Sequence, residues 1–469
     1  MGRSGQEFIK ATPKDLFLQV EDGRRSKLDL FAIRSHDRGM KVLRATRFKL
    51  CPNRSRVREI SNAAGAARWI YNWGLAEWQA RYKRGKTVSY ETLAADIPRL
   101  KKDPKTSWLR EVPSQVLMNL GRAYQNLFDD IAKAKRGQLA WRDVRRPKKK
   151  RFDASRSFRF PAIRPEHINA QAIKLPKIGW VTYRKSRDLE GRVTQATVSR
   201  EADGWYISIL TTNVVEAPAP VNAPVEGIDV GVARTMTFSS GAEPLVMPVL
   251  SAQDRAHRLR LQRRLSRRKK GSKRYARARR ALARNRTKEA RRRRAVLDKA
   301  TTAIVRRSPN IAHEDLRIRN MTASARGTID NPGSNVRQKA GLNRAILEQG
   351  WGMAFRMLAY KAAAAGGAVV KVEARGSSQE CSACGHVSPD NRKAQAKFAC
   401  TSCGHAENAD DNAAKVIAAR GEVLLAARRK AAAGHAASGR GANVRPGAAA
   451  PRRAVVTKRQ PAQPVRRQA

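Results

Sequence analysis

The segment Gly227-Ile228-Asp229-Val230-Gly231 is an apolar run with one acid inside, and it begins the alternation that fills the second half of the chain. We expect strands over Gly227–Phe238, Asn310–His313 and Ala368–Val372. Helical periodicity predicts helices over residues 255–294, over Leu342–Ala365 and from Asn412 to about Arg428. Strands that alternate with helices are typical of an α/β domain.

Acids stand at the ends of these predicted elements, although acids are scarce, at 39 of 469 residues. Asp229 lies inside the first strand, Glu314 follows the second, and Asp410 precedes the last helix. An acid buried on a strand costs several kcal/mol unless cations or hydrogen-bond donors satisfy it. Three acids that converge would hold two Mg²⁺ ions about 4 Å apart, which activate water and stabilise the leaving oxygen in phosphodiester cleavage.

Each of these acids also has a purely structural alternative. Asp229 could accept backbone hydrogen bonds in a turn, and Glu314 could pair with one of the many arginines. Asp410 or its neighbour Asp411 could cap the N-terminus of the last helix. The spacing alone does not choose among these alternatives.

Four cysteines form two pairs, Cys381-x2-Cys384 and Cys400-x2-Cys403, with fifteen residues between the pairs. Two such pairs let four thiolates reach one tetrahedral Zn²⁺ at about 2.3 Å. A redox CxxC motif would be single and would belong to a βαβ unit. Since four thiolates complete the coordination sphere, the predicted Zn²⁺ is structural rather than catalytic.

Residues beside these pairs support a metal site. Gly385 and Gly404 directly follow the two pairs and suit a tight turn that directs backbone N–H groups at sulfur. His386 and His405 come next, and with four thiols present neither is expected to bind the metal. Cys51 is left over, and we expect a buried or inert thiol.

The charge of the chain indicates a polyanionic partner. Lys and Arg number 97 against 39 Asp and Glu, which gives a net charge of +58 and a pI near 11.4. Such self-repulsion destabilises a compact protein unless a polyanion neutralises it, and binding to nucleic acid gains from counterion release. Residues 255–294 concentrate the charge, with 21 Lys or Arg and Glu289 as the one acid. Like charges repel at every i,i+4 contact, so this segment is expected to bind phosphates.

The predicted nucleic-acid contacts come from two basic segments. Those in the helical segment are Arg263, Arg264, Arg267, Arg268, Lys269 and Lys270. Those in the linker that follows Trp141 are Lys148, Lys149 and Lys150. Neither a P-loop nor a dinucleotide-binding motif occurs, so no nucleotide cofactor is expected.

The first half of the chain predicts a small β domain with a helical insertion. The expected strands are Val42–Leu50, Ser157–Phe160, Ala172–Leu175 and Trp180–Tyr183, and a hairpin that pairs Thr194–Ser199 with Trp205–Thr211 across Asp203-Gly204. Two helices are expected after the first strand, one from Val57 to Gly85 and one from Ser114, as N-cap, to Gly137. Their aromatic residues fit helix packing better than base stacking.

No feature of the sequence predicts a membrane partner or an export route. No apolar run reaches the roughly 20 residues of a membrane span, and no stretch near Met1 has the pattern of a secretory signal. Five cysteines are too few for a disulfide framework in a chain of 469 residues. We expect a cytoplasmic, nucleoid-associated protein of prokaryotic type.

Several of these motifs occur in an order that resembles the TnpB (OrfB) family, transposon-encoded proteins regarded as ancestors of the type V CRISPR effectors. The order is Ile228-Asp229-Val230-Gly231, His313-Glu314-Asp315-Leu316, the Ser377–Gly385 knuckle and Ala409-Asp410-Asp411-Asn412-Ala413-Ala414. Also similar to the family are Tyr71-Asn72-Trp73, Ser107-Trp108-Leu109, Pro113-Ser114-Gln115-Val116 and Gly350-Trp351-Gly352. The resemblance covers the chain from about Lys41 to Ala427.

The resemblance implies an RNase H-like (RuvC-type) nuclease domain whose catalytic, Mg²⁺-binding acids are Asp229, Glu314 and Asp410. It selects Asp410 over Asp411, and it implies a zinc ribbon inserted between the second and third acids. It further implies a guide RNA transcribed from the transposon end and cleavage of double-stranded DNA beside a short motif. The alternatives are a non-cleaving nucleic-acid-binding regulator of transposition or transcription, and a transposase proper that joins strands.

The expected architecture is α+β and multidomain, with an interrupted small β-barrel before the nuclease domain. Residues 1–40 are expected to be a variable extension and 429–469 a disordered basic tail. The wedge-like barrel takes 41–53 and 138–222, around a recognition-like or HTH-like helical insertion over 54–137. The nuclease domain takes 223–376 and 407–428, around a zinc ribbon over 377–406.

Overall fold

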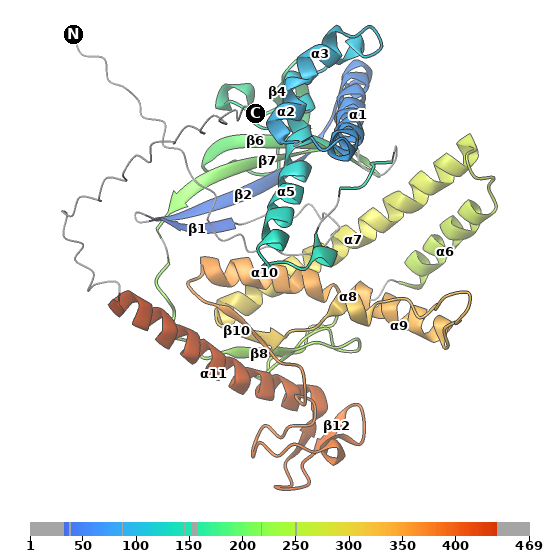
Figure 1. The fold of residues 1–469 in the computed structure, drawn as a ribbon. Coiled ribbons are helices and arrows are strands. Elements are labelled where there is room, and N and C mark those ends of the chain that lie inside the picture. Colours follow the sequence, from blue (N-terminus) through green and yellow to red (C-terminus); the bar gives the residue numbers. More distant parts are fainter. Residues whose placement is uncertain are drawn as a thin grey trace, which may run out of the picture.

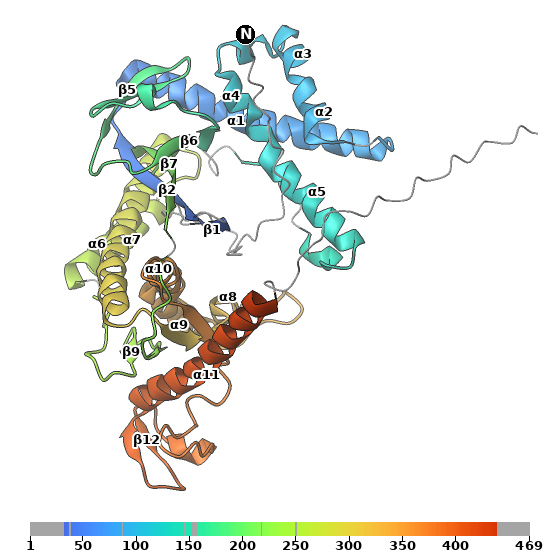
Figure 2. The same cartoon turned by 90° about the vertical axis from the view of Figure 1, so that its left-hand side faces the viewer.

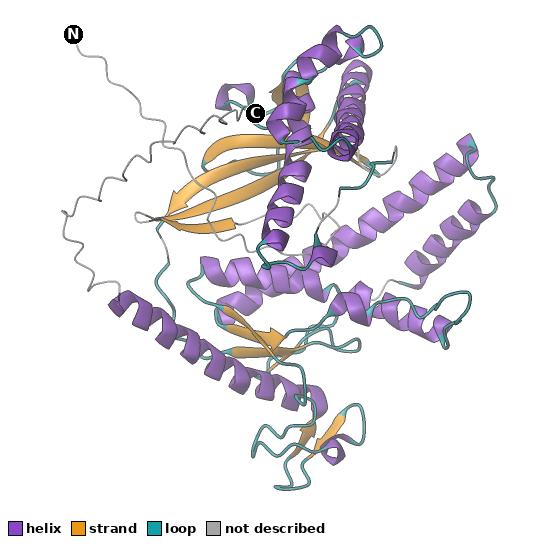
Figure 3. Cartoon of the chain, in the orientation of Figure 1, coloured by secondary structure: helices purple, strands orange, loops and turns teal. Residues whose placement is uncertain are grey.

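The computed structural model describes residues 32–36, 39–86, 88–144, 147–151, 157–216, 218–248 and 251–438. Figure 1 shows a curled sheet with helices above it and a second, smaller sheet that lies between helices below. Figure 3 shows how much of the chain is helical. The predicted extension up to residue 31, the predicted tail from 439 onward, and Arg145 and Arg146 of the linker lie outside the described residues.

The first sheet is antiparallel and has seven strands. They are β1 (Ala32–His36), β2 (Gly39–Leu50), β3 (Ser157–Phe160), β4 (Ala172–Leu175), β5 (Gly179–Arg184), β6 (Arg192–Glu201) and β7 (Gly204–Val215), with a 3-10 turn η4 (Pro165–His167). β1 pairs with β2, and the others follow the order β3-β6-β7-β2-β5-β4. The predicted strands are confirmed.

Three details of this sheet differ from the prediction. The hairpin turn is Ala202-Asp203, because Glu201 pairs with Gly204. The sheet begins at Ala32, within the expected extension. Among the described strands no ladder joins β3 to β4, so the expected barrel is a curled sheet with an open side.

The segment between β2 and β3 is helical, as predicted. It holds α1 (Arg54–Lys83), α2 (Tyr90–Ala95), α3 (Ile97–Lys102), α4 (Ser114–Leu117) and α5 (Gly121–Lys135), with 3-10 turns η1 (Ser107–Arg110), η2 (Met118–Leu120) and η3 (Trp141–Asp143). Asn53 begins α1, because its side-chain oxygen accepts a 2.9 Å hydrogen bond from the Arg56 N–H. Ile60 and Ile70 of α1 pack in one core with Phe158 of the sheet.

The predicted second helix of this insertion is wrong as a single element. The chain turns through η2 between α4 and α5, and Pro113, not Ser114, is the N-cap of α4. The expected apolar face is nevertheless buried at Val116, Leu120 and Leu127.

The second sheet has four strands in the order β11-β10-β8-β9. They are β8 (Glu226–Asp229), β9 (Thr237–Phe238), β10 (Ile311–Glu314) and β11 (Val369–Val372). β8, β10 and β11 are parallel, and β9 is antiparallel to β8. The single strand predicted over Gly227–Phe238 is therefore wrong: the chain turns at Gly231, whose N–H donates to the Arg234 carbonyl at 2.9 Å, and returns as β9.

Helices cover both faces of this second sheet (Figures 1 and 2). They are α6 (Ala252–Ser266), α7 (Lys273–Arg307), α8 (Ile318–Met321), α9 (Val336–Gln349), α10 (Trp351–Ala364) and α11 (Ala409–Ser438). On one face, Ile228 and Ile311 pack with Leu358 of α10 and Ile304 of α7. On the other, Ala312, Val370 and Val372 pack with Ile417 and Leu425 of α11.

Glycines break two predicted helices. Gly271 (φ 87°) lies between α6 and α7, and Gly350 (φ 76°) lies between α9 and α10. A positive φ favours glycine and interrupts a right-handed helix. The last helix starts three residues earlier than predicted and continues past Arg428 to Ser438. No helix in the described ranges combines the length and apolar character that a bilayer crossing requires.

Candidate active site

Two adjacent parallel strands bring Asp229 and Glu314 together. The register pairs Ala312 with Gly227 and His313 with Ile228, so the last residues of β10 and β8, Glu314 and Asp229, follow at neighbouring positions. Side chains alternate along a strand, so each acid shares a sheet face with the residue two positions before it. That face is the one that α11 covers, because Ala312 packs with α11.

Two glycines let α11 lie directly on this face. A Cβ on Gly227 of β8 would come 2.1 Å from the Ala414 carbonyl oxygen of α11. A Cβ on Gly421 of α11 would come 2.4 Å from the Ala312 Cβ. Asp410 lies one helical turn before Ala414, so it shares that helix face and reaches the end of the sheet where Asp229 stands.

The electrostatics of Asp229 place all three acids in one neighbourhood. Burial, together with the nearby Glu314 and Asp410 carboxylates, raises the pKa of Asp229 to about 7, against the opposing effects of the Val230 N–H and Arg392. Burial also raises the pKa of Glu314, although Ser377 donates a hydrogen bond to its carboxylate and Arg420 lies near. The cluster is thus a site of concentrated negative charge, which suits a divalent cation.

The structure distinguishes Asp410 from Asp411 by the partners of their carboxylates. Arg234 donates to both carboxylate oxygens of Asp411 at 3.3 Å, whereas Asp410 forms a longer 3.6 Å ion pair with Arg392. The capping role falls to Asn408, whose side-chain oxygen accepts a 3.0 Å hydrogen bond from the Asp410 N–H. The geometry therefore leaves Asp410, rather than Asp411, facing Asp229.

The four paired cysteines meet in space, as their spacing predicts. The Sγ atoms of Cys381 and Cys403 are 3.7 Å apart, and those of Cys384 and Cys400 are 3.6 Å apart. A tetrahedral site with metal–sulfur bonds of about 2.3 Å has S···S edges of about 3.8 Å. All four Sγ atoms lie within 4.8 Å of one another, and no other such group of three or more ligands occurs in the described part of the chain. The carboxylates are therefore more widely spaced than the thiols.

The two cysteine pairs form matching knuckles around the small hairpin of β12 (Lys397–Ala399) and β13 (Ala406–Asn408), with a 3-10 turn η5 (Pro389–Arg392). Gly385 and Gly404 have φ of 75° and 74°, as a tight turn requires. The histidines are engaged elsewhere, His405 with Glu407 at 2.9 Å and His386 with Thr401 at 3.3 Å.

Three features of the site differ from or escaped the sequence-based analysis. For Cys51, expected to be a buried or inert thiol, the buried alternative is wrong, because the residue is exposed directly after the end of β2. Ser377, which donates to Glu314, has no local signal. Asn412 is fully buried, and its side chain binds the first knuckle. In the sequence, only its position directly after Asp410 and Asp411 indicates a role at this site.

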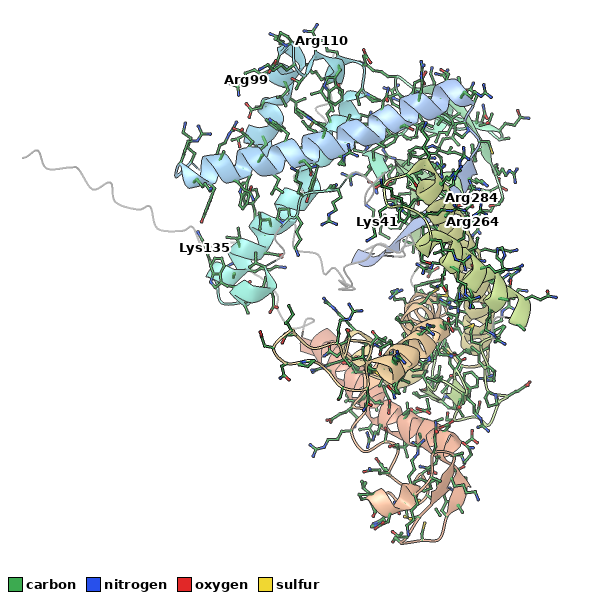
Figure 4. The ribbon with its side chains drawn as sticks, turned by 90° about the vertical axis from the view of Figure 1, so that its right-hand side faces the viewer. Lys41, Arg99, Arg110, Lys135, Arg264 and Arg284 are labelled. Carbon is green, nitrogen blue, oxygen red and sulfur yellow. The ribbon has the colours of Figure 1, made fainter. Side chains whose placement is uncertain are left out.

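The predicted nucleic-acid contacts are mostly exposed. Arg263 and Arg264 of α6, and Arg267, Arg268, Lys269 and Lys270 after it, are all exposed, and no described acid pairs with them. Figure 4 shows Arg264 and Arg284 on the same side of the molecule, on the two basic helices. In the linker, Lys148 and Lys149 are exposed, whereas Lys150 lies over the Tyr71 ring at 3.8 Å.

Three family models match parts of the chain. The one described as "Helix-turn-helix domain" matches residues 40–87, "Probable transposase" matches 208–325, and "Cas12f1-like, TNB domain" matches 351–417. A protein of Escherichia coli (strain K12) named "Putative RNA-guided DNA endonuclease InsQ" is 39% identical over 394 residues, which are 82% of this chain and 94% of that protein. The chain belongs to the TnpB (OrfB) family.

A second relative supports the assignment of the chain to the TnpB family. A Streptomyces pristinaespiralis protein named "Putative RNA-guided DNA endonuclease" is 31% identical over 389 residues, 81% of this chain and 90% of its own length. Among solved structures, "Cryo-EM structure of the Cas12f1-sgRNA-target DNA complex" matches at 15% identity with a TM-score of 0.29, over 80% of this chain and 98% of that chain.

Proposed function

We propose that this TnpB-family chain is an RNA-guided DNA endonuclease with an RNase H-like (RuvC-type) nuclease domain. The observation that carries the proposal is the convergence of Asp229 of β8, Glu314 of β10 and Asp410 of α11. Burial of Asp229 and the two neighbouring carboxylates raise the pKa of Asp229 to about 7. The two relatives that span most of the chain, both named as RNA-guided DNA endonucleases, support the guided activity.

Mg²⁺ fits the carboxylate cluster, because three acids in one neighbourhood lack full compensation by the arginines nearby. Asp229, Glu314 and Asp410 would hold it, and when bound it supplies activation of water and stabilisation of the leaving oxygen in phosphodiester cleavage. The surrounding residues orient these acids. Ser377 donates to Glu314, and Arg392 pairs with Asp410 at 3.6 Å, which limits how far each carboxylate can turn.

Zn²⁺ fits the cysteine cluster as a structural metal. The observed S···S distances of 3.6 and 3.7 Å match a tetrahedral edge. With all four positions taken by thiolates, the zinc ribbon has no open position for substrate, so its role is to shape the chain before α11.

The proposed partners are a guide RNA transcribed from the transposon end and a double-stranded DNA target. A base-paired guide reads the target sequence, while the protein holds the duplex through its shape and backbone. The exposed basic residues of 263–270 and of the linker supply phosphate contacts for that task. The curled sheet and its helical insertion are the proposed grip on the guide–target duplex.

The deciding experiment is to purify the protein, sequence the RNA that accompanies it, and test cleavage of a matching DNA with Mg²⁺. We expect one discrete RNA with a constant part and a variable end, and cleavage that Asp229→Ala abolishes while RNA binding persists. A heterogeneous mixture of cellular RNA fragments would contradict guidance. Normal cutting by Asp229→Ala would contradict the assigned site, binding without cutting would support a regulator, and joined strands would indicate a transposase.

A further inference from the structure

One arginine of α11, Arg420, uses its whole guanidinium group on a single loop. Its Nη1 donates to the backbone carbonyl of Glu373 at 2.7 Å and to that of Arg375 at 3.1 Å. Its Nε donates to the Glu380 carboxylate at 3.1 Å, and its Nη2 donates to the same carboxylate oxygen. All three nitrogens are therefore engaged, and one side chain holds both ends of residues 373–380, the loop between β11 and the first knuckle.

The loop closes on itself as a compact turn. The Gly376 carbonyl accepts hydrogen bonds from the Gln379 N–H at 2.9 Å and from the Glu380 N–H at 3.0 Å. Gly376 has a φ of 77°, a value that favours glycine. Because these bonds lie within the loop, they do not attach it to the second sheet. The bonds from Arg420 connect the turn to α11, which itself packs on that sheet.

Ser377 lies in the middle of this turn and contacts the carboxylate cluster. The residue is buried, its hydroxyl donates to the Glu314 carboxylate, and the Ala374 carbonyl is a second acceptor at 3.1 Å. A hydroxyl has one proton, so it serves one of these two acceptors at a time. Since Ala374 belongs to the turn itself, a turn that moves away from Glu314 keeps the hydroxyl proton for Ala374. The place of the turn therefore decides whether the Glu314 carboxylate is held.

Arg420 also acts on Glu314 through its charge. Burial raises the pKa of Glu314, while the hydrogen bond from Ser377 and the positive charge of Arg420 oppose that rise. None of the described hydrogen bonds of Arg420 reaches Glu314, so the contact between them runs through the turn. The alternative role for Arg420 is a brace between α11 and the zinc ribbon, because Glu380 directly precedes Cys381. A brace would stabilise the fold without a selective effect on the carboxylates.

We propose that Arg420 is a positioning residue of the carboxylate site, which holds the 373–380 turn so that Ser377 orients Glu314 for a divalent cation. A guanidinium suits this task because its planar fork presents donors to several acceptors at once, whereas a lysine offers a single nitrogen. Partners that orient a metal ligand matter greatly, since loss of one costs about 10–100-fold in metal affinity. The inference rests on the proposed function, in which Glu314 is one of the Mg²⁺-binding acids.

The test uses three variants of the full chain and one matched control. Arg420→Lys keeps the positive charge but removes the fork, and Arg420→Gln removes both. Ser377→Ala removes the hydroxyl at the other end of the proposed connection. The control is Arg429→Gln, because Arg429 lies on the same helix and donates its two described hydrogen bonds to the segment before β8, not to the turn.

Metal binding is measured without nucleic acid, as the rise in melting temperature with Mg²⁺ concentration. We expect the Mg²⁺ concentration at half of the full rise to increase about tenfold in Arg420→Lys, Arg420→Gln and Ser377→Ala, and to stay unchanged in Arg429→Gln. Hydrogen exchange over residues 373–380 should become faster in both Arg420 variants, because the turn loses the side chain that holds its two ends. It should stay slow in Ser377→Ala, in which Arg420 still holds the turn.

A double variant tests the order of action. If Arg420 acts through Ser377, then Arg420→Gln combined with Ser377→Ala should shift the Mg²⁺ dependence no more than the larger single change does. In guided cleavage, most of the rate should return at saturating Mg²⁺ in each variant. Zinc content should equal that of the wild type in all of them.

Three results would overturn the inference. An unchanged Mg²⁺ dependence in the Arg420 variants would show that the turn does not orient Glu314. Loss of zinc from these variants would assign Arg420 the role of a brace for the ribbon. Additive shifts in the double variant would show that Arg420 does not act through Ser377. Failure of the proposed function differs from all three, because Mg²⁺ would then not raise the melting temperature of the wild type and no guided cut would occur.

Discussion

The side-chain oxygen of Asn412 accepts a 2.9 Å hydrogen bond from the backbone N–H of Ser382. The amide nitrogen of the same side chain donates a 2.7 Å bond to the Glu380 carbonyl. Cys381 lies between these two partners, so the first knuckle and the first turn of α11 form one hydrogen-bonded unit. The cysteine cluster thereby sets the place of Asp410, two residues before Asn412, relative to the strands.

Asn412→Ala should therefore impair cleavage from outside the carboxylate cluster. It leaves the Ser382 N–H and the Glu380 carbonyl, both half-buried, without these partners, at up to about 1–3 kcal/mol each. We expect a lower melting temperature and at least about a tenfold loss of DNA cleavage, with RNA binding retained. Asn222→Ala is the control, because Asn222 bonds the exposed Arg429 near the other end of α11. Equal activity of the two variants would show that the knuckle does not position the acid.

Loss of the proposed zinc site should have the same consequence. Cys403→Ser takes away one of four thiols whose Sγ atoms lie within 4.8 Å of one another. We expect elemental analysis to find about one zinc ion per wild-type chain and much less in the variant, with cleavage lost in parallel. Cys51→Ser is the matched control, since Cys51 is exposed and remote from the cluster in sequence. Full zinc content in Cys403→Ser would contradict the four-thiolate site.

The parts of the site that sequence predicts are those with fixed local spacing. Two CxxC pairs predict a metal site wherever the chain folds, and the observed sulfur distances agree. The grouping of Asp229 with Glu314 depends instead on which strands are neighbours, which periodicity does not determine. Ser377 could not be found at all, because a lone serine becomes a partner of Glu314 only through tertiary structure.

The fold, like the site, has features that the sequence predicts and others that depend on tertiary structure. Hydrophobic periodicity predicts where helices and strands occur, but not where a glycine with positive φ interrupts them, as Gly271 and Gly350 do. The prediction of one strand over Gly227–Phe238 is wrong for a related reason. The chain turns at Gly231, and the segments on both sides of this turn are apolar. Apolar composition reports burial, and two short buried strands have the same composition as one long strand.

The contact between Gly227 and α11 predicts an unusually costly glycine substitution. Gly227→Ala would place a Cβ 2.1 Å from the Ala414 carbonyl, so α11 must move away from β8. We expect a clear loss of melting temperature and of cleavage, because Asp410 moves with the helix. The control is Gly65→Ala within α1, where no atom beyond the neighbouring residues and the helix's own nearby backbone lies within 4 Å of the new Cβ. That change should be neutral or stabilise by about 0.5–1 kcal/mol, since alanine favours the helix. Similar losses from both substitutions would contradict the close packing.

The raised pKa of Asp229 predicts how pH and Mg²⁺ act on the metal-free protein. Burial and two neighbouring carboxylates raise this pKa from 3.8 to about 7, so the folded chain keeps a proton that the unfolded chain releases. The resulting stability is complete below about pH 4 and is lost as the pH rises through about 7. Melting temperature should fall over this window more steeply in the wild type than in Asp229→Asn, with Asp411→Asn, whose partner is Arg234, as the control. Since Mg²⁺ binds the ionised carboxylate, it should raise the melting temperature more at about pH 8 than at about pH 6. Parallel curves for wild type and Asp229→Asn would show that the pKa of Asp229 is not raised in the folded chain.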